Sequence, residues 1–137
     1  MNRNFIYGGM LAVALLGGCA LPINERDMNA MASSLTKVSA AVDVTVRYQR
    51  SADGLDETQL LQAATAHDPA LLKPFAGRTV KVLRADRDSA VLVCEAPNAR
   101  PLLEDAGCTA RLDVHRWSQN VNDRCEFSLD LKHTCAR

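Results

Sequence analysis

Three segments of the chain alternate apolar and polar positions: residues 41–49, 108–117 and 124–132. In the first, the apolar positions are Val42, Val44, Val46 and Tyr48. Side chains on a β-strand point alternately to its two faces, so this alternation is typical of a half-buried strand. The pattern therefore predicts a strand in each segment, with a polar turn at 118–123 between the last two.

Two more strands are predicted at residues 78–84 and 89–95, where β-branched residues are frequent. Only a short polar stretch separates them, which favours a hairpin. Asp86 and Asp88 fall in this turn, where aspartate commonly makes local hydrogen bonds, so we do not assign them to catalysis. The following residues, 96–107, contain Pro97 and Pro101 and are predicted to be a loop with one helical turn.

The clearest helix signal begins at Asp56. Gln59 follows three residues later as in a capping box, and Leu55 and Leu60 are placed as a hydrophobic staple. These features predict a helix to about residue 66. Asp68-Pro69 then predicts a second helical start, because proline is favourable at the first helical position.

Residues 19–37 allow two interpretations. Asn24 can cap a helix, and Met28, Met31 and Leu35 fall on one helical face. The segment is therefore either a short helix packed on the body or a loose tether. Residues 38–137 are predicted to form one small globular domain, which is as much as a chain of this length can build around its own core.

A short basic start, Asn2-Arg3, precedes an apolar run from Phe5 to Leu16. This order is typical of an export signal, and the run is shorter than the roughly 20 residues of a membrane-spanning helix. Its last four residues, Leu16-Gly17-Gly18-Cys19, resemble the lipobox of bacterial lipoproteins. The resemblance covers residues 1 to about 20, and we recognise no family for the globular domain.

The lipobox resemblance implies that residues 1–18 are a signal peptide and that Cys19 carries the lipid, with acyl chains of the palmitate class. In Gram-negative lipoproteins, an aspartate directly after the lipidated cysteine tends to retain the protein in the inner membrane. This chain has Ala20 at that position. The resemblance thus implies an outer-membrane location, lipid-anchored and facing the periplasm. Display on the cell surface, or an outward-facing anchor in a host with a single membrane, is the alternative orientation. An ordinary secretory signal with an incidental cysteine is the alternative.

Four cysteines remain in the exported part: Cys94, Cys108, Cys125 and Cys135. An even set in an oxidising compartment predicts two disulfides. We favour the sequential pairing, Cys94–Cys108 with Cys125–Cys135, because the linker between the first two is too short for an easy crossover. A hairpin of 108–117 with 124–132 would instead bring Cys108 near Cys135. The expected fold is α+β: a small antiparallel sheet of about five strands with one main helix, stapled by these disulfides.

Composition narrows the function. The formal net charge is zero, from 16 basic and 16 acidic residues, and no basic run suggests nucleic-acid binding. No Cys-x-x-Cys pair occurs, and His67, His115 and His133 fall in no ligand pattern, so we expect no metal and no cofactor. Nucleophile elbows, phosphate loops and HExxH are likewise missing from the sequence, which favours a non-enzymatic protein.

One predicted strand face stands out as a candidate binding surface, formed by Arg111, Asp113, His115 and Trp117. Arginine and tryptophan are enriched in interface hot spots. The competing interpretation is a solvated or helix-covered sheet face. We expect an outer-membrane lipoprotein that binds a protein as an accessory component of the cell envelope or of a secretion system. The alternatives are an envelope inhibitor, immunity or exclusion protein, and a small periplasmic enzyme.

Overall fold

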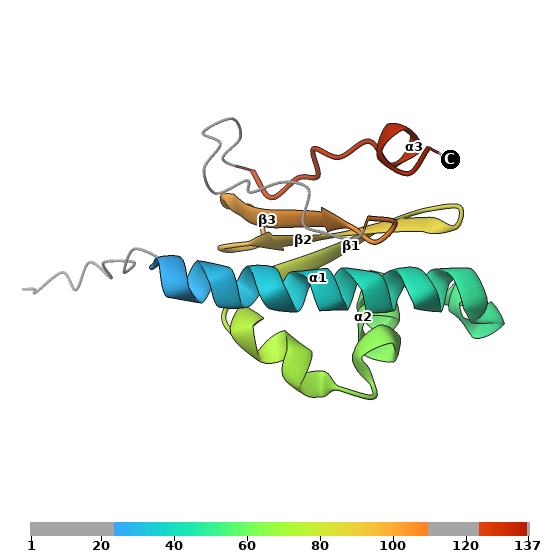
Figure 1. Cartoon of the computed structure of the whole chain (residues 1–137), viewed down its shortest axis with the longest axis horizontal. Helices are drawn as coiled ribbons and strands as arrows, with labels where there is room; N and C mark the ends of the chain where they lie inside the picture. The colour runs from blue at the N-terminus through green and yellow to red at the C-terminus, as the bar shows by residue number, and fades with distance from the viewer. Residues whose placement is uncertain (1–23, 110–123, 137) are drawn as a thin grey trace, which may run out of the picture.

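The computed structural model describes residues 24–109 and 124–136. The elements in chain order are α1 (Glu25–Tyr48), η1 (Arg50–Gly54), α2 (Glu57–Thr65), η2 (Pro69–Phe75), β1 (Thr79–Ala85), β2 (Asp88–Cys94), β3 (Pro101–Ala106) and α3 (Leu131–Thr134). The strands form one antiparallel sheet in the order β1-β2-β3. One main helix, α1, runs along one face of this sheet, and the C-terminal segment 124–136 lies over the other (Figure 1).

The predicted α+β class, the main helix and the two disulfides are confirmed. The prediction of about five strands was too high, since the described residues contain three. The predicted strand at 108–117 lies mostly in 110–123, outside the described residues. Among the helices that are described, none is both long and apolar enough to cross a membrane.

Helix α1 begins where the sequence predicts a helix. The side chain of Asn24 accepts a hydrogen bond from the backbone N–H of Asp27 at 2.8 Å, which is a standard N-cap. The helix buries one stripe of side chains at spacings of three and four: Met28, Met31, Leu35, Val38, Val42 and Val46. This stripe follows the 3.6-residue period of an α-helix and forms the largest part of the core.

The prediction of a strand at 41–49 was wrong, because α1 continues through these residues to Tyr48. Val42 and Val46 lie one turn apart and are buried, whereas Val44 and Tyr48 point outward and are 53% and 78% exposed. The alternation of β-branched residues mimics a strand, yet the helical period set by the preceding residues decides the structure. The predicted boundary between residues 37 and 38 consequently falls inside one continuous helix that belongs to the domain.

Helix α2 has the predicted cap. Asp56 accepts from the Gln59 N–H at 2.8 Å, and the Gln59 side chain accepts from the Asp56 N–H at 3.1 Å. This reciprocal pair is a capping box, confirmed as predicted. The second predicted helical start, at Asp68-Pro69, is the 3-10 helix η2.

We expect Asp56→Ala to lower the free energy of unfolding by about 1 kcal/mol, because the first turn of α2 loses its side-chain acceptor. The matched control is Thr58→Ala, which changes an exposed residue in the same turn without touching the cap. Urea unfolding followed by circular dichroism measures both. Equal midpoints for Asp56→Ala and the wild type would show that the cap contributes nothing.

The predicted hairpin is confirmed as β1 and β2, which pair from Thr79↔Cys94 to Ala85↔Asp88. Asp86 lies at its tip with a φ of 56°, the left-handed region that aspartate tolerates in turns. Asp86 is therefore a turn residue, as its position in the sequence predicts. The hairpin tip lies at the same end of the molecule as the end of α1 (Figure 1).

The prediction of a loop at 96–107 was wrong in its second half, where β3 pairs with β2. Pro101 is the first residue of this edge strand, a position where proline costs no ladder hydrogen bond. All six residues of β3 are buried, including Glu104 and Asp105, because the strand is covered on both faces. Charged residues in a doubly covered strand contradict the usual sequence pattern, which explains the wrong prediction.

The predicted strand at 124–132 was also wrong. Residues 126–130 have no regular structure, and the short helix α3 follows. The Glu104 carboxylate holds this segment on the outer face of the sheet. It accepts from the Ser128 N–H at 2.7 Å, the Ser128 hydroxyl at 2.7 Å and the Leu129 N–H at 3.0 Å.

The sequential disulfide pairing was wrong. The bonds are Cys94–Cys125 and Cys108–Cys135, and both join the sheet side of the molecule to its C-terminal segment. The physical reason is the placement of that segment, which runs back over the sheet and brings Cys125 to the end of β2. The proximity of Cys108 to Cys135 was the argument against the favoured pairing, and these two cysteines are indeed bonded.

Candidate binding pocket at the hairpin end

A hollow of about 370 Å³ lies where the end of α1, the 3-10 helix η1 and the tip of the β1–β2 hairpin meet. We call it the hairpin-end pocket. Arginines from four places in the chain line it: Arg47 of α1, Arg50 of η1, Arg84 of β1 and Arg87 of the hairpin turn. The other lining residues are Val46, Tyr48, Gln49, Asp53 and Asp86.

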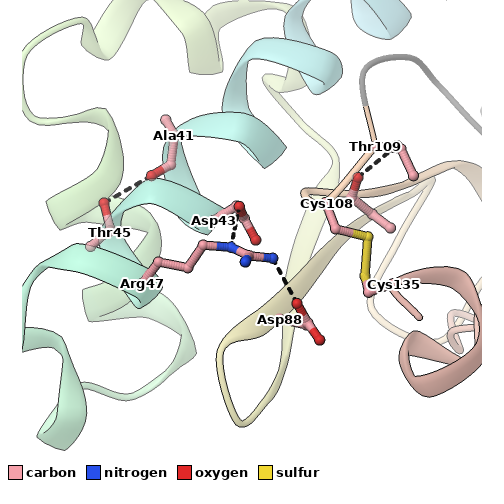
Figure 2. Close-up of polar contacts among 9 residues, drawn as sticks. Ala41, Asp43, Thr45, Arg47, Asp88, Cys108, Thr109 and Cys135 are labelled. Atoms are coloured by element: carbon pink, nitrogen blue, oxygen red, sulfur yellow. Dashed lines mark hydrogen bonds and ion pairs between the residues drawn. A yellow bond between two sulfur atoms is a disulfide. The ribbon is translucent and has the colours of Figure 1, made fainter. Parts of the chain in front are cut away.

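Arg47 lines this pocket and is held in place by two ion pairs. Its Nε donates to Asp43 Oδ2 at 2.6 Å, and its Nη2 donates to Asp88 Oδ1 at 2.7 Å (Figure 2). The Arg47 side chain is only 12% exposed, and the hydrogen bond to Asp43 raises the pKa of its guanidinium above the usual value. Arg47 therefore stays charged and joins α1 to the start of β2.

Arg84 is fixed in a similar way. Its Nη1 donates to the carbonyl oxygen of Ala52 at 2.8 Å, and its Nη2 pairs with Asp53 Oδ1 at 2.9 Å. These contacts tie the hairpin to η1. Because Asp53 is largely exposed, the ion pair itself adds little stability, and its main effect is to orient the guanidinium.

Arg50 and Arg87 differ from these two. Both side chains are exposed, and no ion pair reaches either of them within the part of the chain that the structure describes. Beside them, Tyr48 and Val44 form an exposed apolar strip one turn apart on α1. The pocket thus combines two oriented arginines, two arginines with open donors and an aromatic side chain.

A buried polar cluster joins α1 to the end of β3. The Ser39 hydroxyl donates a short hydrogen bond to the Asp105 carboxylate, and both residues are buried. Gly107 closes the cluster, since a Cβ there would lie 2.5 Å from the Asp43 Cβ and 2.7 Å from the Ser39 carbonyl oxygen. We assign this cluster to packing α1 against the sheet.

The residues predicted as sites fare unevenly. Cys19 and the candidate face of Arg111, Asp113, His115 and Trp117 lie outside the described residues, so both stay predictions. The four disulfide cysteines are all joined in pairs. Asp88, which we did not assign to catalysis, forms an ion pair with Arg47.

A second hollow of about 330 Å³ lies next to the Cys94–Cys125 disulfide. Its Lys81 ammonium donates to the Cys125 carbonyl oxygen at 2.9 Å, and Arg124 and Glu126 in its wall have partners of their own. In residues 24–109 and 124–136, no group of three or more His, Cys, Asp or Glu side chains is arranged to hold a metal ion.

The hairpin-end pocket is not predicted by any pattern in the sequence considered above. Its arginines occur as two pairs with the same spacing, Arg47 with Arg50 and Arg84 with Arg87. Each pair lies beside a change of chain direction, at the end of α1 and at the hairpin turn. This repeated spacing was a usable signal, but only the fold shows that the two turns meet.

Comparisons of the chain with protein-family models, with curated proteins and with solved structures find no match.

Proposed function

We propose that this protein is a lipid-anchored component of the bacterial outer membrane, with its domain in the periplasm, that binds another envelope protein and performs no catalysis. The observation that carries the proposal is the order of Leu16-Gly17-Gly18-Cys19 ahead of a domain with two disulfides. Disulfides persist in compartments outside the cytoplasm, which is where a lipobox would send the chain.

Two surfaces support binding rather than chemistry. The alternation of residues 108–117 predicts Arg111 and Trp117 on one strand face, and Tyr48 lies beside the arginines of the hairpin-end pocket. Tyrosine, tryptophan and arginine are the residues that most often carry interface binding energy. An accessory role in an envelope assembly or a secretion system fits a small anchored binder of this kind.

The anchor is tested by Cys19→Ala. The acceptor sulfur of the lipid is lost, so we expect an uncleaved or soluble protein in place of a membrane-bound one. Membrane fractionation with immunoblotting measures the change. Ala20→Asp is the companion variant, and by the lipoprotein resemblance it should move the protein from the outer to the inner membrane. Unchanged membrane retention of Cys19→Ala would contradict the anchor.

Partner binding is tested by a photo-crosslinking residue placed at Tyr48, at Trp117 or at Ser33 in the full lipidated protein. Tyr48 and Trp117 represent the two candidate surfaces, and Ser33 is an exposed control on α1. We expect a covalent adduct with an envelope protein from at least one of the first two sites and none from Ser33. No adduct from either site would contradict a protein-binding function.

A further inference from the structure

We infer that the hairpin-end pocket is a recognition site for an acidic segment of a protein partner. The inference rests on the proposed function and names the chemistry of the partner at this site. The guanidinium fork donates two parallel hydrogen bonds to a carboxylate, so the two arginines of the pocket whose donors are open, Arg50 and Arg87, suit Asp and Glu side chains.

Two of the four arginines of the pocket are already oriented, and the carboxylates that orient them also balance their charge. Arg47 and Arg84 are held in place by Asp43, Asp88 and Asp53, so their orientation is set before anything binds. A site that is already oriented loses less entropy on binding. Arg50 and Arg87, at the exposed mouth, keep their donors open within the described residues.

The surroundings favour a protein segment over a free anion. Val44 and Tyr48 are 53% and 78% exposed and follow one another by one turn of α1 toward the pocket. A small anion would leave this apolar strip uncovered, whereas a peptide with an acidic side chain could contact both. Tyrosine and arginine are enriched among the residues that contribute most binding energy at protein interfaces, so an exposed Tyr beside arginines favours a protein partner.

The position of the pocket favours a partner that approaches from the periplasm. Cys19 precedes Asn24 by only five residues, which span at most about 18 Å when fully extended. Helix α1 has 24 residues and is therefore about 36 Å long. Figure 1 shows the start of α1 at one end of the body and the hairpin tip at the other. The pocket thus lies at the end of α1 opposite to the anchor.

The test uses the full lipidated protein in nonionic detergent and a fluorescein-labelled polyglutamate peptide, with binding measured by fluorescence anisotropy. We expect R50E/R87E to weaken binding at least about tenfold, because two guanidinium donors are replaced by carboxylates that repel the acidic peptide. R50Q/R87Q, which removes charge without reversing it, should show a smaller loss in the same direction. The matched control R26E/K37E makes the same change in net charge on exposed positions of α1 away from the pocket and should bind within twofold of wild type.

We expect each variant to stay folded, because the changed side chains are exposed, and circular dichroism checks this. Equal weakening by R26E/K37E would overturn the inference, because binding would then follow net charge alone. Displacement of the peptide by millimolar inorganic phosphate would overturn it in favour of a small-anion site. Displacement by micelles containing phosphatidylglycerol would overturn it in favour of a lipid headgroup.

Failure of this inference is distinct from failure of the proposed function. If the protein binds no partner, the crosslinking residues at Tyr48 and Trp117 both give no adduct. If the protein binds a partner at another surface, crosslinked adducts form but R50E/R87E binds the peptide as tightly as wild type does. Only the inference about the pocket is then contradicted.

Discussion

Leu35→Ala is expected to lower the free energy of unfolding by about 3–5 kcal/mol, the range for removing a fully buried leucine where the core cannot close the gap. Leu35 is 0% exposed and lies in the middle of the core stripe of α1. Such a loss is a large part of the 5–15 kcal/mol that stabilises a typical domain. Chemical unfolding in urea, followed by circular dichroism, measures the change.

Ser33→Ala is the control for this variant, because Ser33 is exposed on the same helix two residues away. Its effect should stay within about 0.5 kcal/mol. The pair separates the two interpretations of residues 19–37. If the segment were a loose tether, Leu35→Ala would leave the unfolding midpoint where the control leaves it.

Glu104→Ala is expected to cost about 3 kcal/mol, since hydrogen bonds to a charged acceptor are worth about 1.5–3 kcal/mol each and the Ser128 and Leu129 amides lose theirs. The carboxylate is fully buried and is the main polar link between the sheet and the C-terminal segment. The disulfides remain, so we expect the segment to loosen while it stays attached. Hydrogen exchange at these two amides should accelerate together with the fall in stability.

Glu95→Ala is the matched control, because Glu95 follows β2 directly but is exposed. It should leave both the unfolding midpoint and the exchange at Ser128 unchanged. Unaltered exchange in Glu104→Ala would show that the two disulfides alone hold the C-terminal segment on the sheet.

Local chemistry allowed several elements to be predicted from the sequence. The cap of α2 depends on Asp56 and Gln59, three residues apart, and the hairpin depends on two β-branched runs with a short polar turn. Such signals act over a few residues and need no knowledge of the rest of the fold. The same holds for the Asn24 cap, which marks the start of α1 as the helical one of the two interpretations of residues 19–37 had it.

The errors arose where tertiary packing decides. The alternation of 41–49 is compatible with a strand, but it continues a helical stripe whose burial spans the whole of α1. Strand β3 was missed because Glu104 and Asp105 point into opposite covered faces and each finds a partner there. A buried carboxylate with remote hydrogen-bond donors leaves no signal in the local sequence.

The candidate site was predictable in its chemistry only. Arginine pairs can be read from the chain, but their meeting depends on α1 being long enough to bring Arg47 and Arg50 to the hairpin tip. A strand at 41–49 would have placed them elsewhere. The cysteines were likewise predicted as a set, while their pairing depended on the path of the C-terminal segment.

The central claim, a lipid-anchored domain matured outside the cytoplasm, is tested most directly by the intact mass of the non-reduced protein purified from membranes. The account predicts the mass of residues 19–137 with acyl groups on Cys19, reduced by the four hydrogens lost in Cys94–Cys125 and Cys108–Cys135. Three results would contradict it: the mass of the uncleaved chain from Met1, the mass of a chain cleaved later and without acyl groups, or a mass that retains all four thiol hydrogens.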